Sequence, residues 1–468
     1  MAHAYRTTPE DTTQMPSGIP YIVGNEAAER FSYYGMTGIL MTFMTMHLVN
    51  SQGQAARMNE AEASAVIHYF KAANYFFPFV GAVIADALTG KYLMIVSLSL
   101  VYCLGHAVLF LMDMPVGIEP KHLLYMGLGL IAVGAGGIKS CVSAHVGDQF
   151  GEKNQHLLEK VYMWFYFAIN VGAGVSLYLC PELLDRYGAG VAFGVPGFLM
   201  AAATLVFWLG RNRYAHIPAS RERFVRSLDR EGLLAVARIV PLYLFVAVFW
   251  ALFDQSSSRW IDQAEKMNRT LISIPTGGAE PWTFTIKAAQ TQAANAIFVL
   301  LLIPLFSLVV YPAINKVWRL TPLRKIGLGL FVMVPVFVIS AWIQARIDGG
   351  ATPHIYWQLL AYAVLTSAEV LVSITALEFS YTQAPTALKS LVMGVNMLSV
   401  TLGNLFVGGI NDYIAKMRAS GQTVLEGATY YWFFAGCMAA AAVVYVPWAL
   451  TYRGRSQMQT EAQPPAAT

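Results

Sequence analysis

The chain has 468 residues, of which 56% are hydrophobic and only 12% carry a formal charge. An ordinary soluble domain carries roughly a quarter of its residues as Asp, Glu, Lys or Arg. A water-soluble fold of this length could not cover its surface with so few charges, so the composition excludes a soluble globular protein and predicts many membrane-spanning segments.

Apolar blocks recur along the chain, and many reach the roughly 20 residues that a helix needs to cross a bilayer core. Breaking the sequence at clusters of Pro, Gly and charged residues predicts an all-α polytopic membrane protein with twelve transmembrane helices. The predicted spans are 20–48, 63–87, 92–112, 121–146, 158–180, 189–210, 233–256, 288–312, 322–345, 355–378, 388–415 and 428–452. Small buried thiols, rather than disulfides, are expected inside these blocks at Cys103, Cys141, Cys180 and Cys437.

The distribution of Lys and Arg agrees with two cytosolic termini. When residues near the span ends are counted with the adjoining segments, eighteen of the 31 Lys and Arg residues are assigned to cytosolic segments and nine to extracytosolic segments. The other four, Arg30, Lys71, Lys139 and Arg259, are assigned to spans. Eighteen against nine obeys the positive-inside rule. Residues 1–18 are expected to form a polar cytosolic tail rather than a cleaved signal. We therefore expect a multi-pass protein of the plasma membrane, or of the inner membrane if the cell is bacterial.

The longest basic loop, RNRYAHIPASRERFVRSLDREG, follows the sixth span and divides the spans into two sets of six. Two such sets around a central cavity describe the major-facilitator fold, in which substrate is held near the bilayer midplane. The loop itself is interpreted as a solvated linker, with contact to anionic lipid as the lesser alternative. The predicted units are a cytosolic tail at 1–18, a six-helix bundle at 19–210, the linker at 211–232, a second six-helix bundle at 233–452 and a cytosolic tail at 453–468.

Three charges stand near the start of the first span, in the stretch NEAAERFSYYG. A charge at the centre of a span costs about 2.5–3.5 kcal/mol on insertion scales, so it needs a partner or water. Glu26, Glu29, Arg30 and Tyr33 are spaced i, i+3, i+4 and i+7 and therefore share one helix face. Two carboxylates beside one guanidinium leave a surplus negative charge that a proton or another cation would settle. We expect a polar stripe facing an aqueous interior; the alternative is an ion cluster at a helix end whose charges only neutralise one another.

Seven stretches, in order along the chain, resemble the proton-coupled oligopeptide transporter family of the major facilitator superfamily. They are ERFSYYG within the stretch above, GAVIADALTGK, GAGGIKSCVSAHVGDQF, FYFAIN, FWALFDQSSSRW, QAANAI and EFSYTQAPTALKS. The resemblance covers nearly the whole chain, and its motifs are closest to animal members. It implies a proton-driven symporter that imports di- and tripeptides by alternating access between the two bundles.

The resemblance also implies which residues bind the peptide. Arg30 and Lys139 would hold the carboxylate, and Glu369 in the other half would hold the ammonium. The remaining substrate-binding residues that it implies are Tyr33, Tyr34, Tyr75, Asn170 and Asn295. Such a dipolar site suits peptides with many different side chains, because every short peptide shares two termini and a backbone.

Glu26, Glu29 and His68 are the expected proton-coupling residues. A lone histidine inside a membrane is often a hydrogen-bonded packing residue, whereas the resemblance links His68 to proton handling, and an ordinary pKa of about 6.5 suits that task. Both interpretations of His68 stay open. Lys71 is expected to snorkel or to line the edge of the cavity, and His106, which belongs to no motif, is expected to be structural.

Asp254 and Arg259 are the expected gating residues, in charge pairs that break and reform between outward-open and inward-open states. A static ion pair or a helix-end contact is the alternative. Many family members have a basic residue after YYGM, whereas this chain has Thr37. The usual partner of the acid at position 254 is therefore missing from the first span, and its role is open.

The expected partners are di- and tripeptides, protons and the lipid bilayer, with no nucleic acid, cofactor or metal, and we expect a monomer. A relative that carries nitrate or another small anion is disfavoured, because a pure anion site gains nothing from Glu369. A non-transporting membrane peptide receptor stays open, because the same residues would serve it. A membrane enzyme is not expected, since the spans hold neither His-x-x-x-His spacing nor a Cys/His cluster.

Overall fold

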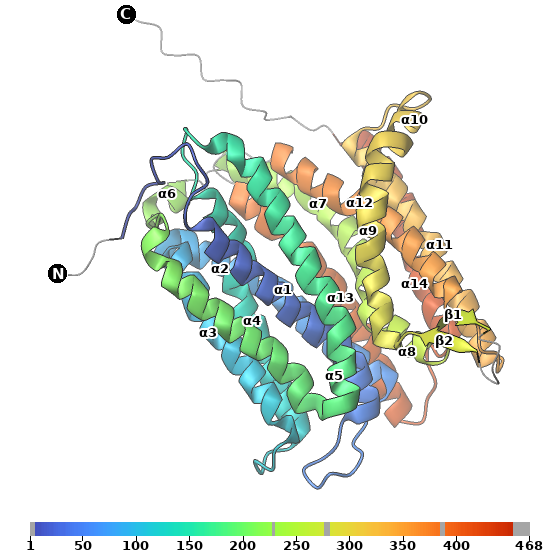
Figure 1. Ribbon diagram of the computed structural model, residues 1–468. Helices are drawn as coiled ribbons and strands as arrows, with labels where there is room; N and C mark the ends of the chain where they lie inside the picture. Colours follow the sequence, from blue (N-terminus) through green and yellow to red (C-terminus); the bar gives the residue numbers. More distant parts are fainter. Residues whose placement is uncertain (1–4, 227–229, 276–280, 384–388, 453–468) are drawn as a thin grey trace, which may run out of the picture.

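A computed structural model describes residues 5–226, 230–275, 281–383 and 389–452 as an almost entirely helical protein. Its long helices run side by side and form an N-terminal bundle, α1–α5, and a C-terminal bundle, α7–α14 (Figure 1). The long helices are α1 (Ile19–Thr42), α2 (Glu60–Ile84), α3 (Lys91–Phe110), α4 (Pro120–Gly147), α5 (Leu158–Leu209), α7 (Arg230–Phe253), α9 (Ala293–Leu305), α11 (Pro322–Asp348), α12 (Tyr356–Gln383), α13 (Lys389–Ala419) and α14 (Ala428–Thr451). Shorter helices are α6 (Arg221–Arg226), α8 (Arg259–Glu265) and α10 (Tyr311–Asn315).

Nine segments of the described chain can cross a membrane by length and composition alone. One of them contains α5, whose 52 residues would make a straight helix of about 78 Å, far longer than a bilayer core of about 30 Å. It bends at Gly188, whose φ of 83° favours glycine, and so supplies two crossings. The helices α1 and α13, with 24 and 31 residues, are long enough to cross but more polar. The prediction of twelve transmembrane helices is thereby confirmed, with boundaries that differ by a few residues.

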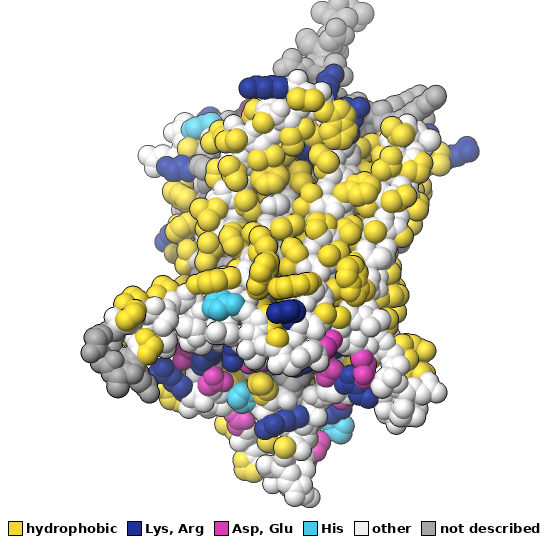
Figure 2. All heavy atoms as spheres, turned by 90° about the vertical axis from the view of Figure 1, so that its right-hand side faces the viewer, with side chains coloured by type: hydrophobic (Ala, Val, Ile, Leu, Met, Phe, Trp, Pro, Cys, Tyr) yellow, Lys and Arg dark blue, Asp and Glu magenta, His cyan; other side chains and the backbone are white. Residues whose placement is uncertain are grey.

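The surface of the molecule is divided into zones that match a bilayer. Hydrophobic side chains cover the middle of the face shown in Figure 2, and charged side chains gather towards its two ends. The described chain begins and ends at one end of the molecule, where α6 also lies (Figure 1). We call the opposite end, which carries α8 and the two β-strands, the distal end.

Each bundle has its own apolar core. Tyr102 and Phe193 are fully buried in the core of the N-terminal bundle, and Phe337 and Phe434 are fully buried in that of the C-terminal bundle. A few residues from α8 and the turn before α9 join the first core, so the two bundles also pack together at the distal end. The assignment of 19–210 and 233–452 as separate units stays a prediction, and the predicted tail at 453–468 lies outside the described residues.

Two short strands interrupt the helical pattern between the seventh and eighth spans. β1 (Thr270–Ile274) pairs with β2 (Trp282–Thr285) in an antiparallel hairpin, which the sequence analysis did not predict. The four cysteines, all of which lie in the described part of the chain, form no disulfides.

Candidate substrate and proton site

The charged residues of α1 lie together in the interior of the N-terminal bundle. Arg30 Nε is 2.8 Å from Glu26 Oε1 and 2.7 Å from Glu29 Oε2, and the two carboxylates are only 3% and 0% exposed as residues. The contact with Glu26 has hydrogen-bond geometry, whereas neither carboxylate oxygen of Glu29 has a hydrogen-bond partner in the described chain. The predicted shared face is confirmed, and two buried acids converge on one guanidinium.

The helix α5 packs very close to the charged part of α1. A side chain at position 172 would collide with the backbone carbonyl of Ala27, so Gly172 permits the approach. Asn170, predicted to contact peptide, is partly buried two residues earlier in the same helix. Close packing at Gly172 therefore brings α5 against the part of α1 that carries the charged stripe, whereas the proximity of Asn170 to that stripe stays a prediction.

Lys139 of α4 lies among aromatic rings rather than beside a carboxylate. Its Nζ is 3.9 Å from the ring centre of Tyr33 and 4.4 Å from that of Tyr75, distances at which a cation is attracted to an aromatic face. In the described chain this ammonium is buried and has no hydrogen-bond acceptor. Three of the predicted binding residues thus meet, and the Lys139 N–H donors stay available to an anionic ligand.

The acidic group predicted to bind the peptide ammonium, Glu369, lies in the C-terminal bundle. Glu369 of α12 accepts a hydrogen bond of 2.8 Å from the amide of Asn295 in α9, which also donates to the hydroxyl of Thr366 at 3.0 Å. No cation within the described ranges forms an ion pair with this carboxylate. Tyr34 of α1 packs edge-on against the ring of Tyr33, with the ring centres 5.3 Å apart.

His68 lies apart from the α1 acids, in a buried joint between the bundles. Its Nδ1 is 2.7 Å from Asn404 Oδ1, and its Nε2 is 2.9 Å from Ser258 Oγ. Asn404 uses its amide nitrogen to donate to Asp254 at 2.7 Å, which leaves its oxygen to accept a hydrogen bond from the Nδ1–H of the imidazole. The predicted proton-coupling groups therefore occupy two places, and both ring nitrogens of this histidine are engaged.

Lys71 corrects the sequence analysis, which expected it to snorkel or to line the cavity edge. Its side chain is 8% exposed, and its Nζ is 2.6 Å from Asp254 Oδ1. The partner of Asp254, missing at Thr37, thus comes from α2. A helix carries residues i and i+3 on neighbouring positions of one face, so the same face of α2 presents His68 and Lys71 to the C-terminal bundle.

Arg259 also pairs with α2. It bonds to Asn411 Oδ1 at 2.7 Å within its own bundle and lies 3.8 Å from Glu60 of α2, which is 2.9 Å from Arg418 of α13. On another part of the interface, Lys287 lies 2.7 Å from Asp185. We call Lys71–Asp254, Glu60–Arg418 and Lys287–Asp185 the distal contacts, because each joins the two bundles in the distal half. Sequence reasoning missed the last two pairs, since nothing local links residues so far apart in the chain.

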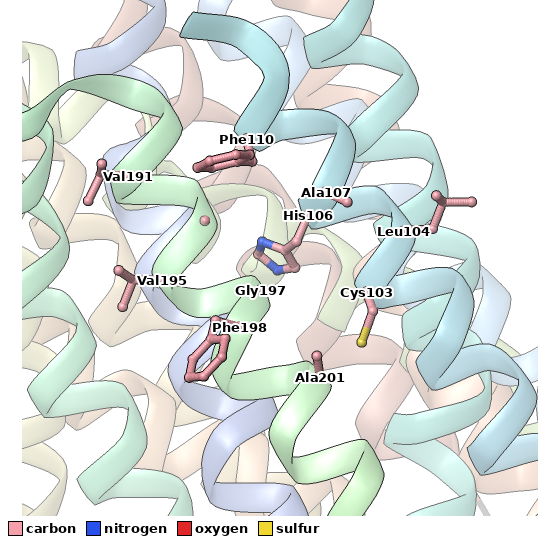
Figure 3. A pocket seen from close by; sticks show the side chains of 11 residues that line it. Cys103, Leu104, His106, Ala107, Phe110, Val191, Val195, Gly197, Phe198 and Ala201 are labelled. Atoms are coloured by element: carbon pink, nitrogen blue, oxygen red, sulfur yellow. The ribbon is translucent and has the colours of Figure 1, made fainter. Parts of the chain in front are cut away.

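A large groove on the outside of the N-terminal bundle has a different character. It has a volume of about 660 Å³ and lies between α3 and the second half of α5 (Figure 3). Its lining is apolar except for Cys103 and His106, and the latter donates through Nδ1 to the carbonyl of Phe193 at 3.0 Å. Without a charged lining it is unsuited to peptide termini, and His106 has the structural contact expected of it.

Comparison with known proteins places these features in a family. The sequence pattern of the POT family matches residues 92–231 and 227–433. The chain belongs to the POT family. Solute carrier family 15 member 2 of Rattus norvegicus is 35% identical over 410 residues, which cover 77% of this chain and 53% of the relative. Peptide transporter family 1 of Drosophila melanogaster is 35% identical over 378 residues, covering 72% and 48%. The chain spans about half the length of the curated relatives it matches.

Solved structures agree with this assignment over almost the whole chain. The crystal structure of the POT family transporter PepTSo has a TM-score of 0.82 and 36% identity, with 94% of this chain and 99% of that chain covered. An auto-inhibited POT family peptide transporter has a TM-score of 0.81 and 33% identity, with 95% and 99% covered. These POT-family neighbours confirm the predicted two-bundle major-facilitator fold and exclude the alternative of a membrane enzyme.

Proposed function

We propose that this POT-family protein is a proton-driven symporter that imports di- and tripeptides by alternating access. The observation that carries the proposal is a pair of opposite, incompletely partnered charge sites in the two bundles. The Lys139 ammonium in the N-terminal bundle has no hydrogen-bond acceptor in the described chain, and Glu369 in the C-terminal bundle is held by a neutral amide. A zwitterionic peptide placed between them would supply the carboxylate and the ammonium that these groups lack.

The proposed orientation of the peptide follows from these charges. Its carboxylate contacts Arg30 and Lys139, and its ammonium contacts Glu369. The proposed neighbours of the peptide backbone and side chains are Asn170, Asn295, Tyr33, Tyr34 and Tyr75. The relative from Drosophila melanogaster is named as a peptide transporter, which supports this substrate class. An anion carrier would have no use for the acid in α12.

Proton coupling is proposed to arise from competition for Arg30. Glu26 and Glu29 both lie within 2.8 Å of its Nε, so a substrate carboxylate must compete with two carboxylates already in place. Protonation of one acid weakens its hold on the guanidinium, and proton and peptide then load together. His68 is a second candidate, and its hydrogen-bond path through Asn404 to Asp254 would connect its proton to the Lys71 ion pair.

Alternating access would require the distal contacts to break. Asp254 and Arg259 both reach across to α2, which supports their proposed gating role. We further propose that the chain ends face the cytosol, that the protein is a monomer of the plasma membrane or the bacterial inner membrane, and that the distal end faces outward. The excess of Lys and Arg in the segments on the side of the chain ends supports this orientation.

The decisive experiment uses purified protein in liposomes with an imposed proton gradient. One proton moving through 100 mV releases about 2.3 kcal/mol, enough for roughly 40- to 50-fold accumulation of a neutral dipeptide at a ratio of one to one. We expect uphill uptake that disappears when an ionophore collapses the gradient. Uptake that only ever follows the peptide's own gradient would contradict symport, and binding without any flux would indicate a receptor.

A further inference from the structure

The β1–β2 hairpin carries an apolar face. Ile272 lies opposite Phe284, and Ile274 lies opposite Trp282. Directly opposed residues of an antiparallel pair share a face, and successive residues of a strand alternate between faces. All four large side chains therefore project from one face, and they are 49%, 40%, 50% and 53% exposed in that order. Ser273 and Thr283, which oppose each other, project from the other face.

The connections of the hairpin keep its base close to two membrane-length segments. The membrane-length segment before it ends at Glu265, and the one after it begins at Ala288. Strand β1 begins five residues after the first, and β2 ends three residues before the second. An extended chain advances at most about 3.6 Å per residue, so the base of the hairpin cannot move far from the ends of these two spans.

Aromatic side chains mark the level at which the hairpin lies. The hydroxyl of Tyr356, at the start of α12, donates to the backbone carbonyl of Leu271 in β1. The next residue, Trp357, lies with its ring centre 4.7 Å from that of Trp342 in α11, and these two side chains are 46% and 42% exposed. Trp and Tyr concentrate where the headgroups of a bilayer meet its hydrocarbon core. The hairpin is thus hydrogen-bonded to Tyr356, beside two exposed Trp side chains of the kind that mark a bilayer interface.

The apolar face also continues into the surface of a membrane-spanning helix. A groove of about 290 Å³ separates the hairpin from α9, and its lining includes Phe284 and Ile286 on one side and Ile297 and Phe298 on the other. Ile297 is 58% exposed, on a segment that is membrane-length and strongly apolar. Lipid that covers this side of α9 would therefore reach the groove and the apolar face of the hairpin.

We infer that the β1–β2 hairpin is an interfacial membrane anchor. Its apolar face lies at the boundary between headgroups and acyl chains of the distal leaflet, and an acyl chain fills the groove beside α9. A two-stranded hairpin is marginally stable alone. Contact with lipid would remove the four large side chains from water, which the rest of the protein leaves half-exposed, and would thereby stabilise the hairpin. The inference is independent of the transported substrate, because it concerns the lipid surface only.

Single cysteines on opposite faces of the hairpin test the anchor. Ile274→Cys and Trp282→Cys sample the apolar face, and Ser273→Cys and Thr283→Cys are matched controls one residue away. Each is spin-labelled in the full chain and reconstituted into phosphatidylcholine liposomes, with identically treated wild-type protein giving the background from its four native thiols. Accessibility is then measured to oxygen, which concentrates in the bilayer, and to a water-soluble nickel chelate.

We expect a shift towards oxygen and away from nickel at 274 and 282, and the reverse at 273 and 283. Equal accessibility of the two faces to nickel would overturn the anchor. Protection at 274 and 282 that disappears when the protein is diluted in excess lipid would also overturn it, since a second copy of the chain would then be the cover. All four sites are exposed, so no variant opens the core, and Ile272→Cys provides an independent repeat on the apolar face.

Discussion

Charged side chains in the centre of this molecule and in its distal half are partnered in different ways. In the distal half the charges meet directly: Lys71 with Asp254 at 2.6 Å, and Arg418 with Glu60 at 2.9 Å. In the centre, Arg30 also meets two carboxylates, but the Lys139 ammonium faces two aromatic rings, and Glu369 accepts only from a neutral amide among the described residues. One region has its charges satisfied by the protein, and the other holds charges that a ligand could satisfy.

This difference separates two uses of buried charge. Breaking a buried ion pair such as Lys71–Asp254 leaves an uncompensated charge and is strongly unfavourable, so this pair stabilises one arrangement of the bundles. A charge that lacks a partner of opposite sign gains most when such a partner arrives, as a zwitterionic peptide would. The same residue types thus select a conformation in one place and a substrate in the other.

The largest effect is expected from Lys71→Met, which leaves Asp254 buried with only its amide partner. Losing one member of a buried pair typically costs about 3–5 kcal/mol. Because this pair joins the bundles, the cost falls on the distal-closed arrangement. We expect the distal ends to separate, measured as longer distances between spin labels at Gln52 and Ser420, which are exposed loop residues of opposite bundles.

The double variant Lys71→Met/Asp254→Asn is the control for this prediction. It removes the unpaired charge together with its partner, so we expect it to recover most of the short distances. If the single variant keeps the parental distances, the pair does not hold the distal end closed.

The next effect concerns Glu29, whose carboxylate contacts Arg30 without a hydrogen bond. Glu29→Gln keeps the shape of the side chain and imitates its protonated form permanently. We expect loss of the roughly 40- to 50-fold accumulation that 100 mV can support, with peptide-for-peptide exchange retained, because exchange needs no proton release. Both assays are run on the same liposomes, with Glu26→Gln and His68→Gln in parallel. Full accumulation in both acid variants together with its loss in His68→Gln would move the proton site to α2.

A smaller effect should distinguish the two ends of the substrate. Glu369→Gln removes the charge that faces the ammonium, and a hydrogen bond to a charged group contributes about 1.5 kcal/mol or more, roughly tenfold in affinity. We expect peptides with a free amino terminus to weaken by that factor while N-acetylated peptides change little. Arg30→Ala should instead make free and amidated carboxyl ends equivalent. Competition assays in which all four ligands lose affinity equally would contradict the proposed orientation.

The local features of this chain could be predicted from its sequence. Hydrophobic blocks of membrane length identify the spans because the bilayer sets their length, and the helical repeat places Glu26, Glu29 and Arg30 on one face. The hairpin is not predicted because its strands are short, although the alternation in TLISI and WTFT on either side of a Pro- and Gly-containing stretch of sequence is a usable signal.

Pairings between distant segments could not be predicted in the same way. Glu60 and Arg418 are 358 residues apart, and Lys71 pairs with an acid in the other bundle. Such contacts depend on how the two bundles pack, and no local period encodes that packing. Asn404, a polar residue inside a span, was a visible signal that the sequence analysis did not use. A buried amide in a membrane needs a partner, and here it links His68 to Asp254.

The smallest effect is expected from Lys287→Gln, at the exposed edge of the distal contacts. Lys287 lies 2.7 Å from Asp185 and 3.2 Å from Glu182, with 28% of its side chain exposed. Exposed ion pairs contribute about 1 kcal/mol or less, and the screening length falls to about 3 Å in 1 M salt. We therefore expect the distance between labels at Gln52 and Ser420 to be slightly longer in Lys287→Gln than in the parent protein at low salt. The difference should disappear at about 1 M salt, where the pair in the parent is itself screened.

Lys266→Gln is the matched control, because its 2.9 Å pair with Asp262 lies within one bundle and should leave the label distances unchanged at any salt concentration. Lys71→Met provides the opposite reference, since its buried pair is shielded from salt and its effect should persist at 1 M. An effect of Lys287→Gln that resists salt would show that this contact behaves as a buried pair. The exposed fraction of an ion pair would then fail to predict how salt affects it.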